Sequence, residues 1–215
     1  MLESIKGLIP QIGEGLVVTL KIFILTLIFS IPLGIIVSLG RTSKIKIIEK
    51  ITGIYVLIMR GTPLLLQIVF IFYGLPLMGI TIANRTIAAL IAFVLNYGAY
   101  FAEIFRGGIL SIDKGQYEGA AVLGFSSRDT FFRIILPQAI KKILPPVSNE
   151  IITLVKDTSL VYVVGLNELL KVGKVAANRV GSLLPLVVVG IVYLIIIAIL
   201  TKLLRKIEDR YSYYE

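Results

Sequence analysis

The run LVVVGIVYLIIIAIL, residues 186–200, decides the fold class because it contains no charged residue and only one with a polar tip. The apolar segment around it, residues 183–204, reaches the roughly 20 residues that a helix needs to cross a ~30 Å hydrocarbon core. Inside lipid, backbone N–H and C=O groups must find partners within the segment, and a helix provides them. This run therefore predicts a transmembrane helix.

Similar apolar segments precede it along the chain. They cover residues 16–39, 51–77, 86–105 and, less regularly, 134–166. No internal repeat or linker divides them. We therefore expect an all-α membrane protein with about five transmembrane helices, forming a single domain over residues 1–215.

The composition agrees with a membrane protein and excludes several kinds of chemistry. Hydrophobic residues make up 57% of the chain and charged residues 16%, with a mean hydropathy of +0.93; a soluble domain is closer to half apolar and a quarter charged. The absence of Cys and His excludes disulfides, the usual zinc sites and Ser/His/Asp catalysis. The net charge of +9 lies mainly in loops between apolar spans, which favours membrane topology over nucleic-acid binding.

The loop charges also predict an orientation. Most Lys and Arg residues fall in residues 41–50, 106–142 and 202–210, which would all be cytoplasmic if the N-terminus is outside and the C-terminus inside. Lys171, Lys174 and Arg179 count against this orientation. The expected location is the inner or plasma membrane, with several passes.

The longest cytoplasmic segment, about residues 106–142, contains the sequence EGAAVLGFSSRDTFFRIILP at residues 118–137. We expect short helices at 117–123 and 129–136, with Gly124 ending the first in a left-handed cap and Pro137 stopping the second. Short helices outside the bilayer are suited to docking a soluble partner.

This segment resembles the signature of permease subunits of ABC-type importers, E-A-A, three residues, G, nine residues, I-x-L-P. Glu118, Ala120, Gly124, Ile134 and the Leu136–Pro137 pair fall at the expected spacing, and the one departure is Gly119, where the family usually has Ala.

Three further segments resemble the branch of these permeases that carries polar amino acids. They are RGTPLLLQIVFIFYGLP (60–76), NYGAYFAEIFRGGILSIDKGQYEGA (96–120) and VKDTSLVYVVGLNELL (155–170). The resemblance implies the type I permease fold and a coupling helix that docks on a cytoplasmic ATP-hydrolysing subunit. The residues expected to couple to that ATPase are Glu118, Gly119, Ala120, Gly124, Phe125 and Ser126.

The resemblance also implies the partners. They are the ABC ATPase, which carries ATP and Mg²⁺, a second permease chain in a homodimer or heterodimer, and an extracellular or periplasmic solute-binding protein. Small residues such as Gly98, Ala99 and Ala102 would allow close helix approach in that dimer. This chain has no G-x-x-x-x-G-K-[ST] phosphate loop, so we expect no enzyme activity and no cofactor of its own.

Ionisable and polar residues within spans are costly and usually functional. The sequence Arg60-Gly61-Thr62-Pro63 suggests a kinked pocket wall, or a simple proline kink with Arg60 paired to a carboxylate. Pro63 and Gly61 would open the helix there.

Two other clusters of polar residues each allow two interpretations, one functional and one structural. Asn96, Tyr100 and Glu103 share one helical face, where Glu103 would bind a substrate cation or pair with Arg106. Residues 156–159, Lys-Asp-Thr-Ser, suggest a broken helix that lines a cavity, or a neutralised Lys156–Asp157 pair.

Together these clusters predict a site for a zwitterion, with basic amino acids favoured by the carboxylates of Glu103 and Asp157. The residues expected to line it are Thr62, Asn96, Tyr100, Glu103, Asp157, Thr158 and Ser159. The leading hypothesis is thus the permease subunit of an ATP-driven importer of polar, basic amino acids such as arginine, lysine or histidine. A passive channel, an ion-coupled carrier and a structural subunit are the alternatives.

Overall fold

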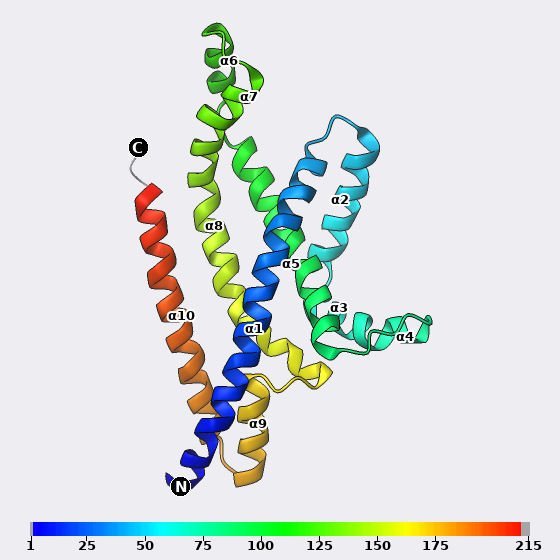
Figure 1. Cartoon of the computed structure of the whole chain (residues 1–215), viewed down its shortest axis with the longest axis vertical. Coiled ribbons are helices and arrows are strands. Elements are labelled where there is room, and N and C mark those ends of the chain that lie inside the picture. Colours follow the sequence, from blue (N-terminus) through cyan, green and yellow to red (C-terminus); the bar gives the residue numbers. More distant parts are fainter. Residues whose placement is uncertain (1, 212–215) are drawn as a thin grey trace.

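The computed structural model describes residues 2–211, with side chains from residue 9 onward, and the elements found there are helical (Figure 1). Most are α-helices; η1 and η2 are π-helical and η3 is a 3₁₀-helix. In chain order they are α1 (Leu2–Arg41), α2 (Lys46–Gly61), α3 (Leu64–Val69), η1 (Phe70–Gly74), α4 (Leu75–Leu77), α5 (Arg85–Leu110), α6 (Lys114–Val122), α7 (Ser127–Asp129), η2 (Thr130–Ile135), α8 (Leu136–Asp157), η3 (Thr158–Val164), α9 (Leu169–Val180) and α10 (Leu184–Tyr211).

The described helices differ in whether they could cross a membrane. Within the described residues, α1 from Ile9, α5 and α10 are each long and apolar enough to cross a membrane. α2 together with the continuous helical stretch of α3, η1 and α4 (residues 64–77) would add one span, bent by 104°. α8 and η3 cover residues 136–164 of the predicted segment 134–166, but α8 carries too many polar residues to stand among these apolar spans. The all-α membrane class is confirmed, and about five spans remains a prediction.

α1 and α5 form the centre of the molecule because small residues let them pack closely. A side-chain carbon added at Gly34 on α1 would lie 2.7 Å from Cβ of Phe101 on α5, and one added at Gly98 would lie 2.7 Å from Leu33. Ala99 and Ala102 are fully buried in the same contact. The hypothesis that these small residues of α5 pack against a second chain was wrong, since this chain's own α1 covers them.

The break between α2 and α3 turns the chain sideways, so that η1 and α4 project from the side of the bundle (Figure 1). Thr62 and Pro63 separate the two helices, both with extended backbone. Pro63 cannot donate a backbone hydrogen bond, which prevents α2 from continuing. The predicted opening of the helix at this point is confirmed.

α8 begins at the far end of the molecule and runs back along α5 and α10 (Figure 1). It remains helical through Pro145 and Pro146 and changes to the 3₁₀-helix η3 after Asp157. η3 ends at Gly165, whose φ of +82° lies in the left-handed region that favours glycine. The predicted irregularity at residues 156–159 is therefore a change of helix type.

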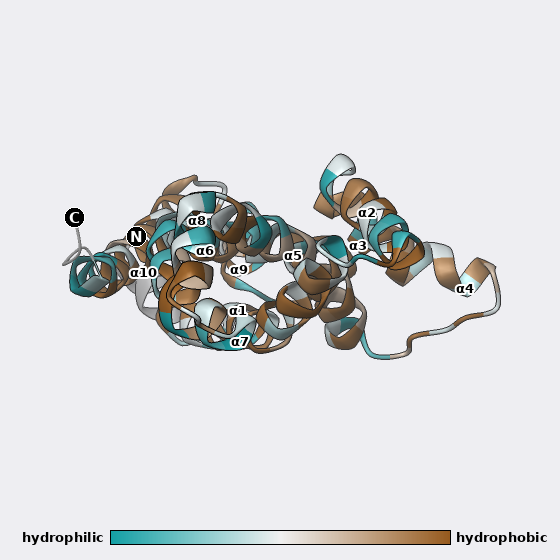
Figure 2. Ribbon diagram, turned by 90° about the horizontal axis from the view of Figure 1, so that it is seen from above, coloured by the Kyte–Doolittle hydropathy of each residue, from teal (hydrophilic) through white to brown (hydrophobic). Residues whose placement is uncertain are grey.

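The segment expected to dock on the ATPase forms, with α6 and α7, the tip of the molecule at the end opposite the N-terminus (Figure 1). Gly124 has φ +76°, and the N–H groups of Gly124 and Phe125 donate to the carbonyls of Ala121 and Ala120, each at 3.0 Å. The predicted left-handed cap after α6 is thus confirmed. Seen from this end, hydrophilic residues gather on α6, α7 and the C-terminal end of α10, above helices that are largely hydrophobic (Figure 2).

The prediction that Pro137 stops the following helix was wrong. The chain passes from α7 through η2 directly into α8, with Pro137 in the first turn of α8. At that junction the N–H of Leu136 donates to the carbonyl of Phe131, the wider spacing of a π-helix. This wider turn accommodates the proline within a continuous helical path.

Candidate functional site

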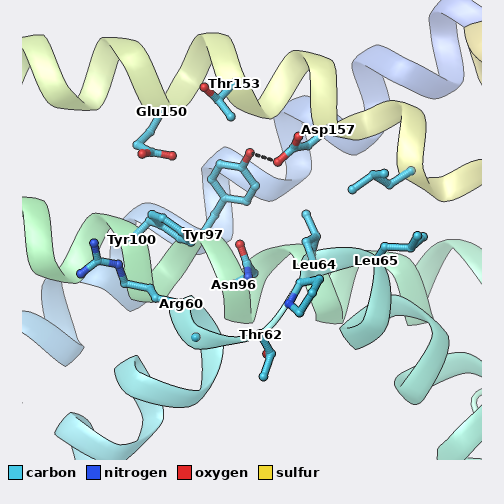
Figure 3. Close-up of a pocket in the computed structure, with 13 residues that line it drawn as sticks. Arg60, Thr62, Leu64, Leu65, Asn96, Tyr97, Tyr100, Glu150, Thr153 and Asp157 are labelled. Atoms are coloured by element: carbon cyan, nitrogen blue, oxygen red, sulfur yellow. Dashed lines mark hydrogen bonds between the residues drawn. The ribbon is translucent and has the colours of Figure 1, made fainter.

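A cavity of about 560 Å³ lies where the α2–α3 break faces α5 and α8 (Figure 3). Its size is within the range of small-molecule sites. The lining residues are Arg60, Gly61, Thr62, Pro63, Leu64, Leu65, Asn96, Tyr97, Tyr100, Glu150, Thr153, Asp157 and Leu160.

The wall at the break is held by side-chain amides that replace missing backbone donors. In a continuous helix the carbonyl of Met59 would accept from the N–H of residue 63, which Pro63 lacks. Asn96 Nδ2 and Gln67 Nε2 each donate to this carbonyl at 2.9 Å. Thr62 Oγ1 donates to the carbonyl of Ile58 at 2.8 Å, so side chains from α3, α5 and the break itself satisfy the freed end of α2.

The opposite wall is acidic and comes from one face of α8. Glu150, Thr153 and Asp157 are three and four residues apart, the spacing of neighbours on a helix surface. The Tyr97 hydroxyl on α5 donates to Asp157 Oδ2 at 2.7 Å, a short bond to a carboxylate that fixes its position (Figure 3).

The remaining charge in the cavity is the guanidinium of Arg60 at the end of α2. Its Cζ lies 5.1 Å from the centroid of the Tyr100 ring, a cation–π contact that holds it at the cavity edge. The lining thus contains the carboxylates of Glu150 and Asp157 and one guanidinium. Asn96 adds a neutral acceptor, since its Oδ1 points toward the cavity while its Nδ2 faces the helix break (Figure 3).

Of the residues expected from the sequence to line a site, the structure brings together Thr62, Asn96, Tyr100 and Asp157. Glu103 does not line the cavity. Its Oε2 lies 2.7 Å from Arg106 Nη2 and its Oε1 lies 3.2 Å from Arg41 Nε. The internal salt bridge weighed for Glu103 is therefore present, with Arg41 of α1 as a second partner.

Thr158 and Ser159 also lie outside the cavity lining. Thr158 is fully buried, and its Oγ1 donates to the carbonyl of Val155 at 2.6 Å. The alternative pairing of Lys156 with Asp157 is not formed: Lys156 is exposed, and the described partner of Asp157 is Tyr97.

The sequence reasoning missed Tyr97, Glu150 and Thr153. Glu150 and Thr153 carry a readable signal, because they precede Asp157 by seven and four residues and so share its helical face. Tyr97 neighbours Asn96 but contacts Asp157 60 positions away, a pairing that only the packing of α5 on α8 creates.

Comparison with known proteins identifies the family. The sequence profile described as the binding-protein-dependent transport system inner membrane component matches residues 30–213. The chain belongs to this family. It has the type I fold of ABC importer permeases, and the predicted signature segment lies within the matched residues.

Similar proteins have amino acid transport in their names. The arginine transport system permease protein ArtQ of Bacillus subtilis is 40% identical over 94% of this chain and 93% of its own length. The glutamine transport system permease protein GlnP of Escherichia coli is 36% identical, covering 97% and 96%. A crystal structure of an amino acid ABC transporter with histidines is 33% identical, with a TM-score of 0.90 over 97% of both chains.

A more distant structure, the inward-facing MetNI methionine transporter, is 18% identical to this chain. Its TM-score is 0.73 over 94% of this chain and 96% of that one, and it supports the fold alone. This chain is thus a permease subunit of an ABC importer, in a group whose named relatives move amino acids. The family implies an ATPase, a substrate-binding protein and a permease dimer as partners.

Proposed function

We propose that this permease imports basic amino acids, with the cavity at the α2–α3 break as the translocation site. The observation that carries the proposal is the charge set of the lining, Glu150 and Asp157 against Arg60. At neutral pH, arginine or lysine carries two positive groups and one negative group. The cavity offers the complementary set, so each ligand charge would have a partner of opposite sign.

The polar groups around these charges support the same ligand class. Asn96 Oδ1 would accept from an ammonium or guanidinium N–H, and the guanidinium of Arg60 at the cavity edge would pair with the carboxylate (Figure 3). Glu103, previously expected to supply the second carboxylate, is paired with Arg41 and Arg106, and Glu150 takes its place.

The relatives are compatible with this proposal, although their names give different amino acids. The similar proteins named above are an arginine and a glutamine permease, and the related crystal structure is described with histidines. A cystine transport permease of Bacillus subtilis is 38% identical as well. The charge set favours the basic class among these.

Energy would come from a separate ABC ATPase docked on residues 106–142, with Glu118, Gly119, Ala120, Gly124, Phe125 and Ser126 at or near the contact. ATP hydrolysis there would shift the permease between inward- and outward-facing populations. ATP and Mg²⁺ would be held by that partner.

The test is uptake of labelled L-arginine into proteoliposomes that contain the chain, its ATPase and its binding protein. We expect uptake only with ATP, and competition by lysine or histidine but not by an equal concentration of glutamine or cystine. Uptake that ignores ATP would indicate the channel or carrier alternative. Stronger competition by glutamine would refute the basic specificity.

A further inference from the structure

Gln67 lies directly behind the cavity wall, on the first turns of α3. It is 9% exposed and does not line the cavity. Its Nε2 lies within hydrogen-bond distance of three acceptors: the carbonyls of Met59 (2.9 Å) and Thr62 (3.2 Å) and Thr62 Oγ1 (2.9 Å). Its Oε1 accepts from Asn96 Nδ2 at 3.1 Å.

One side chain therefore joins the end of α2, the start of α3 and the middle of α5. The two protons of Gln67 Nε2 are shared among acceptors that belong to the interrupted helix. Asn96 Nδ2 is held twice, by the Met59 carbonyl and by Gln67 Oε1. Because both contacts require a donor on Asn96, they orient its amide with Nδ2 toward the break and Oδ1 toward the cavity (Figure 3).

We propose that Gln67 is a positioning residue for the substrate cavity, which acts through Asn96 by fixing the Asn96 amide with Oδ1 available to a cationic N–H of the ligand. The inference rests on the proposed function of the cavity. Gln67 itself would not touch the ligand.

The surroundings of Gln67 make this network strong and hard to replace. On its other side lies an apolar groove of about 400 Å³, lined by residues that include Ile58, Leu66 and Phe70. Hydrogen bonds are stronger in such a setting than in water, and an unpaired polar group there is costly. Without Gln67 the Asn96 amide would keep only the Met59 carbonyl as a partner and could rotate.

The experiment measures the L-arginine affinity of the purified permease–ATPase complex without the binding protein, and the uptake kinetics of the complete system, for Gln67→Met, Asn96→Leu and the double variant. Methionine preserves side-chain length and removes both the donor and the acceptor. We expect each single variant to bind arginine at least tenfold more weakly. The double variant should bind no more weakly than Asn96→Leu alone, because Gln67 acts through Asn96.

The uptake kinetics distinguish a positioning role of Gln67 from a purely structural one. Gln67→Met should raise the half-saturation concentration for arginine much more than it lowers the maximal rate. The matched control is Leu66→Met, which introduces the same residue one position away, outside the cavity lining, and should leave both values unchanged. If Gln67→Met fails to reach the membrane, Gln67→Asn keeps the amide on a shorter stem and should show the same non-additivity with Asn96→Leu.

The role of Gln67 is overturned if the fold-losses of arginine affinity in the two single variants multiply in the double variant. It is also overturned if Gln67→Met leaves the affinity unchanged. The proposed function is judged separately by Asp157→Asn. If Asp157→Asn weakens arginine binding and Gln67→Met does not, only the positioning role fails. If neither changes the affinity, the cavity is not the arginine site.

Discussion

At the scale of single residues, Glu150 and Asp157 decide what the cavity attracts. Replacing either by its amide keeps shape and hydrogen bonding but removes one negative charge. We expect Asp157→Asn and Glu150→Gln each to raise the half-saturation concentration for arginine by roughly tenfold or more, the scale of 1.4 kcal/mol or above. Uptake assays in proteoliposomes measure it. Glu49→Gln, an exposed acid at the start of α2, is the control and should change little.

Glu103 is expected to act on stability and not on affinity. Its carboxylate pairs with both Arg41 and Arg106, whose side chains are 25% and 28% exposed, and so ties α1 to α5. Glu103→Gln should lower the stability of the complex by about 1–3 kcal/mol, because charged hydrogen bonds are lost in a largely buried place. Thermal melting of the purified complex measures this. An unchanged melting temperature with a strongly weakened arginine affinity would return Glu103 to the substrate site.

Residue-level reasoning from the sequence predicted as site residues four of the eight polar side chains that line the cavity, and there is a physical reason for the rest being missed. Spacing along one helix correctly grouped Asn96 with Tyr100, and the same rule on α8 would have grouped Glu150 with Asp157. Spacing does not say which neighbouring helix a face meets. Glu103 shares the face of Asn96 but lies nearer the end of α5, where Arg41 of α1 approaches it.

At the scale of elements, the close contact of α1 and α5 depends on Gly34. An added methyl there would collide with Phe101 and with the backbone of Ala102, neither of which can move freely. Overpacking of this kind costs about 1–3 kcal/mol, so Gly34→Ala should lower the melting temperature of the complex. Gly190→Ala on α10, where nothing lies within 4 Å, is the matched control and should be neutral or slightly stabilising. Equal effects of the two changes would contradict the packing of α1 on α5.

The elements were predictable where a local rule dominates. Pro63 and Gly124 act on the backbone alone, and both behave as the sequence indicates, one opening a helix and the other capping one. Pro137 was misjudged because its effect depends on the π-helical turn before it, which the sequence does not reveal. The fourth segment shows the same limit, since only Glu150, Thr153 and Asp157 among its polar residues face the cavity, and other helices decide which face that is.

At the scale of the whole molecule, the tip formed by α6 and α7 lies beyond the start of α8 (Figure 1), whereas Glu150, Thr153 and Asp157 line the cavity in the second half of that helix. Gly124 holds that tip in a conformation that other residues adopt only with strain, about 1 kcal/mol or more. Gly124→Ala should therefore reduce ATP-driven uptake and ATPase association while arginine affinity stays unchanged. The control is Gly13→Ala on α1, where an added side-chain carbon has nothing within 4 Å and which lies outside the segment expected to dock the ATPase; it should keep both functions. Reduced arginine affinity in Gly124→Ala, with ATPase association intact, would contradict a coupling role for the tip.

The most direct test of the cavity is a structure of the assembled transporter with L-arginine bound. We expect ligand density between α5, α8 and the α2–α3 break, with the cationic groups within hydrogen-bond distance of Glu150 or Asp157 and the carboxylate near Arg60. Density for arginine at another place in the permease, with this cavity empty while the same preparation transports arginine, would contradict the assignment.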